Sequence, residues 1–353
     1  MERVAFCIIF AILSNYSLAQ ETTRFETEIP DSPRPWMHEG LDTGEDRFTF
    51  AVFSDLEGGN RSRVFDVAIA QLSLLKPELI LNVGDLIAGP SDNPEELHAL
   101  WDSFDERTAK AQAPVFYVGG NHDFGNDSDS GEVSQRVWAE RYGPTYYSFK
   151  YKDVLFLVIN TQDGAPTAER SQELAPMQQE TRRLISEGAQ ISDAPFFYTH
   201  EMRGGFISDD QTDYFLNAIS DNQDVRWTFL FMHKAPWEEG GDENFSAIED
   251  ALASRPYTVF HGHEHSYQYL ERKGRDYIRL ATTGGGQPLS YHKSTISDRV
   301  EGRSVDQVAL VTVDNSGVDI ANLLLSGILD KTGHIPLKGD DVCFELSICG
   351  SND

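Results

Sequence analysis

Short apolar runs alternate along the first half of the chain with stretches whose apolar residues recur every three or four positions. An apolar run at 47–54 is followed by a stretch at 61–75 with helical spacing. The same order repeats with a run at 78–83 and a helical stretch at 94–109, and a further run at 114–118 follows. This alternation of strands and helices predicts a layered α/β domain.

The second half of the chain is richer in expected strands. Strands are expected at 145–151, 153–160, 196–199, 227–233, 257–260, 267–270, 277–281, 308–313 and 318–323, and helices at 211–219 and 245–253. Residues 161–194 are polar and long for a connection, so we expect a partly helical excursion there. The main domain is expected to span 47–325, between a polar, proline-rich and irregular lead-in at 20–46 and a tail at 326–353.

The N-terminal residues have the order of a secretory signal. Arg3 precedes an apolar run at 4–13, and the later triplet Ser17-Leu18-Ala19 has a small residue at each of its ends. This order predicts a signal peptide at 1–19 with cleavage after Ala19, and therefore a secreted or periplasmic protein. A buried first helix is the alternative. No later stretch has the length of a membrane span, so we expect none once the signal is removed.

The cysteines add one expectation about the tail. Of the three cysteines, Cys7 lies in the expected signal, while Cys343 and Cys349 lie in the tail. In an oxidising compartment these two could form a local disulfide, and two free thiols are the alternative. The sequence has no Cys-x-x-Cys pair, so a structural zinc site built from thiolates is not indicated.

The charge balance excludes one class of partner. The sequence has 57 acidic residues against 29 Lys and Arg, which gives a formal net charge of -28. Such a surface repels a phosphate backbone, so we do not expect sequence-independent binding of nucleic acid.

Carboxylate, amide and imidazole side chains follow several of the expected strands. They are Asp55 and Glu57 after the first, Asp85 after the second, Asn121 and His122 after the third, His233 after the strand at 227–233, and His263 and His265 after the strand at 257–260. Sites in open α/β sheets form at the carboxyl ends of strands, so these side chains are expected to converge. His261, at the start of the last segment, is expected to be structural or to line the site.

This ordered set resembles the calcineurin-like metallophosphoesterases. That family carries the motifs Asp-x-His, Gly-Asp, Gly-Asn-His followed by Asp or Glu, a lone His, and Gly-His-x-His. The matching segments here are Asp55-Leu56-Glu57, Gly84-Asp85, Gly120-Asn121-His122-Asp123, His233 and Gly262-His263-Glu264-His265. The resemblance covers roughly 47–325 and implies a four-layer sandwich of two mixed β-sheets flanked by helices, with two metal ions at one end.

The resemblance also implies roles for these residues. The first metal would be held by Asp55, Asp85, His265 and the residue at position 57, and the second by Asp85, Asn121, His233 and His263. Asp85 would bridge the two ions. His122 would lie beside the leaving group, and Asp123 is a candidate to orient His122. The implied activity is hydrolysis of phosphate esters by a hydroxide that bridges the metals.

Glu57 departs from the family pattern, because a histidine usually stands at this position. Glu57 could ligate the first metal, which we favour, or accept a hydrogen bond from a metal-bound water. Alternatively the first site is weak, and the protein is a non-catalytic relative that binds a metal or a ligand. Ligation by Glu57 would favour manganese, iron or magnesium at the first site, with zinc possible at the second.

A second departure concerns Ala88. It stands where the purple acid phosphatases have a tyrosine ligand, so a tyrosinate-bound iron is not expected.

Evidence for the substrate is thinner. Arg61 and Arg203 are candidates to contact a phosphate, and Trp237 is a candidate to line a pocket. A small phosphorylated substrate is expected, with monoesters narrowly favoured. The alternative is a phosphodiesterase acting on cyclic nucleotides or lipid head groups. The sequence does not indicate an oligomeric state.

Overall fold

The computed structural model describes residues 25–29, 33–36, 46–61, 63–125, 129–164, 168–189, 193–287, 302, 304–325 and 327–330. The expected signal peptide at 1–19 and the tail with Cys343 and Cys349 lie outside the described residues. Within the described ranges, no helix combines the length and the apolar character needed to cross a bilayer.

The larger sheet contains seven strands among the described residues. Their spatial order is β1 (Phe25–Thr27), β5 (Tyr147–Tyr151), β6 (Val154–Val158), β7 (Trp227–Phe231), β8 (Tyr257–His261), β10 (Arg275–Arg279) and β9 (Gln268–Arg272). The central strands from β6 to β10 pair in parallel, while the strands at both edges pair antiparallel. This sheet is therefore mixed, as the sequence analysis predicts.

The second sheet, with six described strands, contains the first core strand of the chain. Its order is β13 (Gly327–Asp330), β12 (Gly317–Leu324), β11 (Gln307–Asp314), β2 (Phe48–Phe53), β3 (Leu79–Asn82) and β4 (Val115–Phe116). β2, β3 and β4 pair in parallel, and β11 joins β2 antiparallel. Parallel pairing makes β2, β3 and β4 end at the same edge of the sheet.

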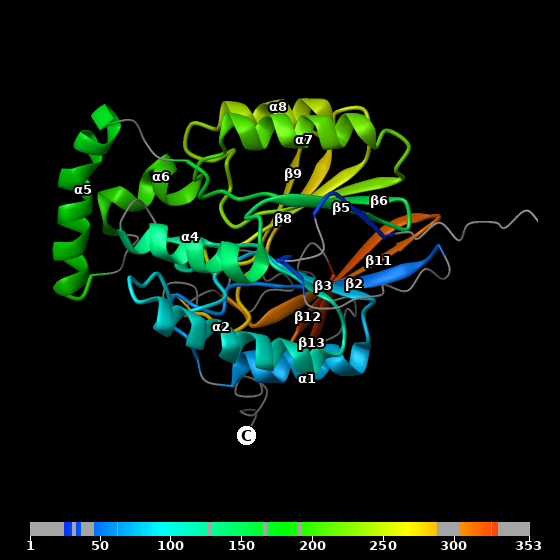
Figure 1. Ribbon diagram of the computed structural model, residues 1–353, viewed down its shortest axis with the longest axis horizontal. Helices are drawn as coiled ribbons and strands as arrows, with labels where there is room; N and C mark the ends of the chain where they lie inside the picture. Colours follow the sequence, from blue (N-terminus) through cyan, green and yellow to red (C-terminus); the bar gives the residue numbers. More distant parts are fainter. Residues whose placement is uncertain are drawn as a thin grey trace, which may run out of the picture.

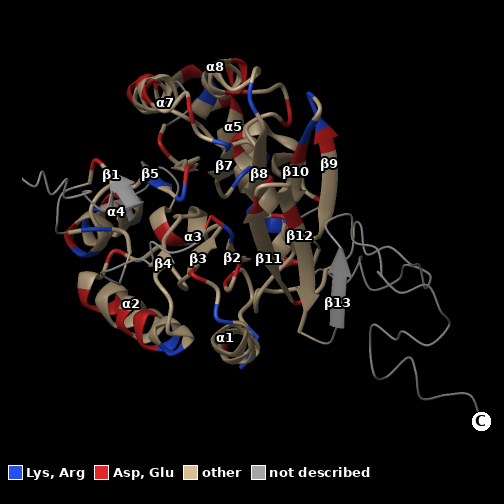
Figure 2. Cartoon of the chain, turned by 90° about the vertical axis from the view of Figure 1, so that its right-hand side faces the viewer, with Lys and Arg blue, Asp and Glu red and all other residues tan. Residues whose placement is uncertain are grey.

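Helices cover the outer faces of both sheets (Figures 1 and 2). α1 (Val64–Leu75), α2 (Pro94–Thr108) and α4 (Asp129–Tyr142) pack on the six-stranded sheet, while α7 (Asp209–Asp221) and α8 (Glu243–Ala251) pack on the other. Between the sheets lies an aromatic core in which the rings of Phe50 and Phe229 meet edge to face at 4.9 Å. The four-layer sandwich is confirmed.

Local sequence explains where several helices begin and end. Asn93 accepts a hydrogen bond from the backbone N–H of Glu95 at 3.0 Å, and Pro94 occupies the first turn of α2, where no N–H is needed. α1 ends at Leu75, and the C-cap residue Lys76 adopts a left-handed backbone before Pro77.

The excursion after β6 is helical and lies at one side of the molecule in Figure 1. It contains α5 (Ala168–Ser186), the 3-10 turn η3 (Pro195–Tyr198) and α6 (His200–Arg203). The strand expected at 196–199 is therefore wrong. Thr199 instead caps α6, since its hydroxyl accepts the backbone N–H of Met202 at 3.3 Å.

The described part of the lead-in is more ordered than the sequence indicates. β1 adds a strand to the edge of the larger sheet, and the Trp36 side chain is buried against Phe116 with ring centroids 5.5 Å apart. A lone strand and a lone tryptophan have no periodicity of their own, so their partners on β5 and β4 decide their structure.

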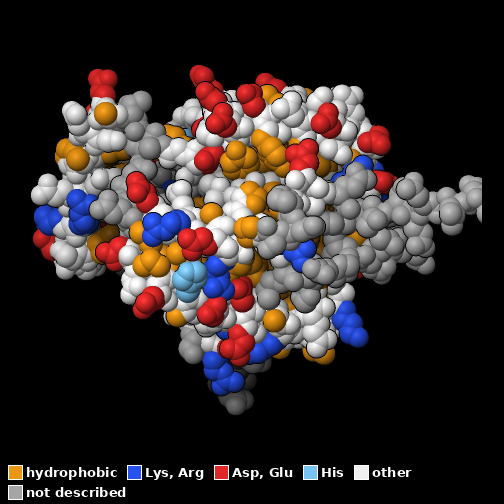
Figure 3. Space-filling view, in the orientation of Figure 1, with side chains coloured by type: hydrophobic (Ala, Val, Ile, Leu, Met, Phe, Trp, Pro, Cys, Tyr) orange, Lys and Arg blue, Asp and Glu red, His pale blue; other side chains and the backbone are white. Residues whose placement is uncertain are grey.

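The surface reflects the acidic composition. On the face shown in Figure 3, acidic side chains are spread widely, and Lys and Arg lie among them. Figure 2 shows acidic residues along the outer sides of α2, α7 and α8.

Candidate metal centre

Polar side chains that follow five strands meet at one edge of the sandwich. Among the described residues, two groups each place three potential ligand atoms within 4.8 Å of one another. One group is Asp85, His233 and His263, and the other is Asp55, Asp85 and His265. Asp85 belongs to both groups, which is the position that the resemblance implies for a bridging ligand.

Asp85 reaches this position through a tight turn after β3. Gly84 has φ +95°, and a Cβ on it would lie 2.9 Å from Gly120 Cα and 2.8 Å from His233 Nδ1. Asp85 itself has φ 57°, in the left-handed region. The Asp85 carboxylate accepts the backbone N–H of His122 at 2.9 Å and lies 3.2 Å from His233 Nε2.

The His233 side chain is buried, and a backbone carbonyl fixes the orientation of its ring. Its Nδ1 lies 2.8 Å from the carbonyl oxygen of Val83, which fixes the proton on Nδ1. In the neutral ring, Nε2 therefore directs a lone pair into the group, where it lies 3.0 Å from Asn121 Oδ1 and 3.2 Å from His263 Nδ1. The amide oxygen and both imidazoles expected around the second metal are thus adjacent.

His265 is oriented in the same way on the other side. Its Nδ1 lies 2.5 Å from the carbonyl oxygen of Gly286, and its Nε2 lies 3.4 Å from Asp55 Oδ1. Asp55 is fully buried, and the Ser54 hydroxyl donates a hydrogen bond to its other oxygen. The Asp55 carboxylate also accepts the backbone N–H of His263 at 3.0 Å, which links the first and last segments of the centre.

Glu57 lies beside the centre but in neither group of three. Its carboxylate accepts a hydrogen bond from Asn60 Nδ2 at 2.8 Å, and the side chain is buried. Burial raises the pKa of Glu57, against the effect of Asn60 and the nearby His122. Ligation of a metal by Glu57 therefore stays a prediction.

His122 lies at the more exposed side of the centre. Its Nδ1 lies 3.2 Å from the carbonyl oxygen of Gly89, and its Nε2 lies 4.0 Å from Asp85 Oδ2. The ring is partly exposed, so a substrate could reach it.

Asp123 has a different set of partners from those expected. Its carboxylate accepts backbone N–H groups from Gly120 at 2.8 Å, Leu86 at 2.9 Å and Ile87 at 3.1 Å. It therefore joins the turn that carries Asp85 to the turn that carries Asn121. This differs from the expectation that Asp123 orients the His122 ring. Burial, together with the charge of Asp85, raises the pKa of Asp123 to about 8.

The buried charges of the centre are strongly coupled. Burial opposes ionisation of Asp85, but the facing His233 outweighs it and holds the pKa of Asp85 below its usual range. Burial likewise opposes protonation of His233, yet Asp85 raises the pKa of His233 to about 9. Burial and the neighbouring His233 lower the pKa of His263, so His263 is neutral and has a lone pair to donate.

Two of the three candidate substrate residues, Arg61 and Trp237, are engaged within the protein. Arg61 pairs with Asp306 through two nitrogens, and its Nε donates to the carbonyl oxygen of Gly285 at 2.9 Å. Trp237 packs edge-on against His261 and Tyr277, with ring centroids 4.9 and 4.7 Å away. Substrate contacts by Arg61 and Trp237 stay predictions.

Sequence reasoning does not find the groups that orient the imidazoles. They are the backbone carbonyls of Val83 and Gly286, and any residue type supplies a carbonyl. Asn60 and Ser54, which contact Glu57 and Asp55, were also missed, although both are neighbours of those carboxylates in the sequence.

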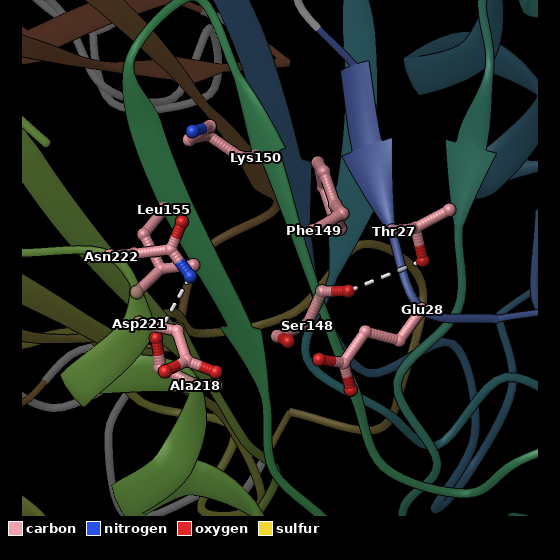
Figure 4. A pocket seen from close by; sticks show the side chains of 9 residues that line it. All are labelled: Thr27, Glu28, Ser148, Phe149, Lys150, Leu155, Ala218, Asp221 and Asn222. Carbon is pink, nitrogen blue, oxygen red and sulfur yellow. Dashed lines mark hydrogen bonds between the residues drawn. The ribbon is translucent and has the colours of Figure 1, made fainter.

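A pocket of about 320 Å³ lies away from these groups (Figure 4). It is formed by the end of β1, by β5 and β6, and by the last turn of α7, and Ser148, Lys150, Asp221 and Asn222 are among its lining residues. Its lining includes none of the candidate ligands, so the chemistry indicated by the converging carboxylates and imidazoles lies elsewhere.

A family model described as calcineurin-like phosphoesterase matches residues 48–267. The chain belongs to this family. The matched range contains every candidate ligand from Asp55 to His265 and ends before β11 and β12, which complete the second sheet.

Similar proteins support the assignment to the calcineurin-like family. The mouse (Mus musculus) serine/threonine-protein phosphatase CPPED1 is 32% identical over 111 residues, which cover 30% of this chain and 34% of that protein. CPPED1 from Danio rerio is 34% identical over 88 residues, which cover 25% of this chain and 28% of that protein. The chain thus spans about a third of the length of these curated relatives.

Solved structures share the calcineurin-like fold. A dimetal phosphatase from Danio rerio has a TM-score of 0.52 at 14% identity, over 81% of this chain and 99% of that one. A purple acid phosphatase from yellow lupin (Lupinus luteus) has a TM-score of 0.53 at 12% identity, over 80% of this chain and 53% of that one. At these identities the likeness shows the fold alone.

Proposed function

We propose that the protein is a metal-dependent phosphoesterase whose centre holds two cations. The observation that carries this proposal is the position of Asp85, whose carboxylate is shared by two groups of ligand atoms. A carboxylate offers two oxygens and a negative charge, so it suits a position between two cations.

The donor set fits cations better than it fits hydrogen bonding alone. Around His233 Nε2 stand an Asp85 oxygen, the Asn121 oxygen and His263 Nδ1, all within 3.2 Å. When His233 is neutral, with its one proton on Nδ1, these atoms bring several lone pairs together with few protons to share. Such a buried set is costly unless a positive charge lies among its members.

Each candidate ligand has a place in this scheme. Asp55, Asp85 and His265, with Glu57, would hold the first cation, and Asp85, Asn121, His233 and His263 would hold the second. When bound, a pair of such ions supplies charge neutralisation for the phosphoryl oxygens and activation of water. The carbonyls of Val83 and Gly286 hold the two imidazoles with their Nε2 atoms toward the ions.

His122 is placed to handle the proton of the leaving group. The Gly89 carbonyl holds its Nδ1, and Nε2 is the nitrogen on the side of the centre, 4.0 Å from Asp85 Oδ2. A proton on Nε2 could pass to the departing oxygen of the ester, and a positioned acid of this kind contributes about 10²–10⁴-fold to the rate.

The finer features of the proposal rest on the sequence. With Glu57 as a ligand, the first site would have three carboxylates and one imidazole, which favours manganese, iron or magnesium. The acidic surface disfavours nucleic acid, which supports a small phosphate ester, and within that class a monoester is the expected substrate. The signal-like order of residues 1–19 supports export, and sequencing the N-terminus of exported protein tests it by showing Gln20 first.

Turnover with manganese is the direct test of activity. The protein starting at Gln20 should hydrolyse p-nitrophenyl phosphate faster than bis-p-nitrophenyl phosphate, and should carry two metal ions per chain by elemental analysis. A preference for the diester would instead support a phosphodiesterase. One ion or none, with no turnover of either ester, would support a non-catalytic binding protein.

The role of His122 can be separated from metal binding. His122→Gln should lower kcat by about 10²–10⁴-fold while keeping two ions per chain. His98→Gln, on the partly exposed surface of α2, is the matched control and should behave as the wild type. Equal kcat values for the two variants would remove His122 from the proposed chemistry.

A further inference from the structure

A second cluster of charges lies directly behind the turn that carries two of the candidate ligands. Glu264 stands between His263 and His265, and its side chain points away from the centre toward two arginines. One carboxylate oxygen accepts Arg203 Nε at 2.6 Å, and the other pairs with Arg279 Nη1. Glu264 is 11% exposed, so solvent screens these contacts only in part.

Arg279 anchors the turn to the larger sheet. It lies on β10 and is largely buried, and it also donates to the backbone carbonyl of Ser266 at 2.8 Å and to the Ser266 hydroxyl at 3.0 Å. Through Glu264 and Ser266, this one guanidinium grips the turn on both sides of His265. Arg279 therefore fixes the position of the backbone from which the His265 side chain extends.

Arg203 connects the same turn to two other segments. It ends α6, and it pairs with Glu238 at 2.8 Å and Glu239 at 2.7 Å in the segment that follows His233. The backbone N–H of Ala235 also donates to the Arg203 carbonyl at 3.1 Å. All three guanidinium nitrogens of Arg203 pair with carboxylates of the protein. A phosphate contact by Arg203 would have to compete with these pairs, and it stays a prediction.

The turn needs such support because its backbone is strained. His263 has φ 76° and His265 has φ 52°, and both lie in the left-handed region. A non-glycine residue there costs about 1–2 kcal/mol, and the cost is met only where surrounding contacts hold the conformation. Because both residues have a left-handed backbone, the side chain of His263 can join one group of candidate ligands and that of His265 the other.

We propose that Glu264, clamped by Arg203 and Arg279, is a positioning residue that sets the places of His263 and His265 and ties α6 to the metal centre. This inference rests on the proposed metal centre. The contacts described above for these three side chains include no candidate ligand atom, so the clamp acts through the backbone of the turn. Contacts behind metal ligands of this kind are typically worth about 10–100-fold in metal affinity.

Metal affinity measures this role directly. In Glu264→Gln the amide keeps the size of the side chain but places an N–H group against one of the arginines. Titration calorimetry of the metal-stripped protein with Mn²⁺ should show affinity reduced about 10–100-fold, with two ions still bound at saturation.

The matched control is Glu249→Gln, because Glu249 is also a buried carboxylate held by two cations, Arg272 and Lys273. It should lose thermal stability but keep the Mn²⁺ affinity of the wild type. If both variants lose similar stability and Glu264→Gln keeps wild-type affinity, the clamp is only structural and the inference is overturned. A wild type that binds no Mn²⁺ would instead overturn the proposed function, and this inference with it.

A milder pair of variants covers the case in which Glu264→Gln does not fold. Arg203→Lys keeps the charge but loses the forked contact with Glu264, Glu238 and Glu239. Its Mn²⁺ affinity should fall, whereas Arg183→Lys on the exposed surface of α5 should leave it unchanged. Mn²⁺ should also slow amide hydrogen exchange in α6 of the wild type, and the slowing should be smaller in Arg203→Lys. If amide exchange in α6 of the wild type is the same with and without Mn²⁺, the proposed link between α6 and the metal centre is wrong.

Discussion

Gly120 is packed so closely in the centre that no side chain fits there. A Cβ at this position would lie 2.2 Å from Asp85 Oδ1 and 2.5 Å from the Asp85 backbone nitrogen. The shared carboxylate is thus seated against a residue without a side chain. A one-carbon change here must move the Asp85 turn, the Asn121 turn, or both.

We therefore expect Gly120→Ala to abolish high-affinity Mn²⁺ binding and to reduce the free energy of unfolding by about 1–3 kcal/mol. Calorimetry and denaturant unfolding measure the two effects. Gly188→Ala is the control, since it lies in open space with φ +89° and should lose stability through its backbone alone. Normal Mn²⁺ binding by Gly120→Ala would contradict the close packing described for Asp85.

At Glu57 this chain departs from its family, and substitution of Glu57 tests whether its carboxylate binds the first metal. Glu57→His should keep or raise turnover and move the metal preference toward zinc, because an imidazole replaces a hard oxygen donor. Elemental analysis after loading with mixed metals measures the shift. Ligation by Glu57 is wrong if Glu57→Ala retains both the metal content and the turnover of the wild type.

The candidate ligands could be found from the sequence because they follow strands in a recognisable order. Asp85, His233 and His263 are far apart in the chain, yet each follows an apolar run, and parallel strands bring such positions to one edge. The grip of Arg203 on Glu264 could not be found this way. Arg203 lies in a polar excursion with no periodic pattern, so only its folded position reveals the contact.

At the scale of helices and strands, buried ion pairs fasten α8 to the sheet beneath it. Glu249 on α8 is fully buried and accepts hydrogen bonds from Arg272 Nε at 2.7 Å and Tyr277 Oη at 2.5 Å. Burial opposes its charge, but Arg272, Tyr277 and Lys273 outweigh burial and lower the pKa of Glu249 from its ordinary value of 4.5.

A group whose pKa is lower in the folded protein adds stability above its unfolded pKa. Glu249→Gln should therefore reduce the free energy of unfolding by about 1–3 kcal/mol at pH 7, and this difference should shrink as the pH falls below about 4.5. Urea unfolding of both proteins from pH 7 to pH 3 measures it. Glu271→Gln, on the exposed side of β9, is the control, and a pH-independent difference would contradict the argument.

Some elements escaped the sequence analysis for identifiable reasons. β1 and the Trp36 contact depend on partners distant in the chain, so local pattern gives no signal for them. α4 was missed although Val133, Val137 and Trp138 have helical spacing, because its remaining residues are mostly polar. The aromatic run at 196–198 has strand propensity, but Pro195 begins a 3-10 turn there.

For the molecule as a whole, the proposed cations should be part of its stability. Asp55 and Asp85 place two buried carboxylates in one group of ligand atoms, which favours the folded state only when positive charge is present. A ligand that binds the folded state alone at 100 times its Kd adds about 2.7 kcal/mol.

Removal of metal with a chelator should therefore lower Tm, and added Mn²⁺ should restore it in a concentration-dependent way. Differential scanning calorimetry measures both changes. Asp85→Asn should lose the response to Mn²⁺, while Asp319→Asn on the distant hairpin of β11 and β12 should keep it. A Tm that does not respond to either treatment would contradict the metal centre.

The pairing of β2 with β11 has a consequence for how the chain is made. β2 is the first strand of the inner core, but one of its edges is covered only by β11, close to the end of the described chain. Until the ribosome has released those last residues, the aromatic strand Phe48–Phe53 has open backbone groups that can join a strand of another nascent molecule. Chains that terminate before β11 should accumulate as aggregates even though they already contain every candidate metal ligand.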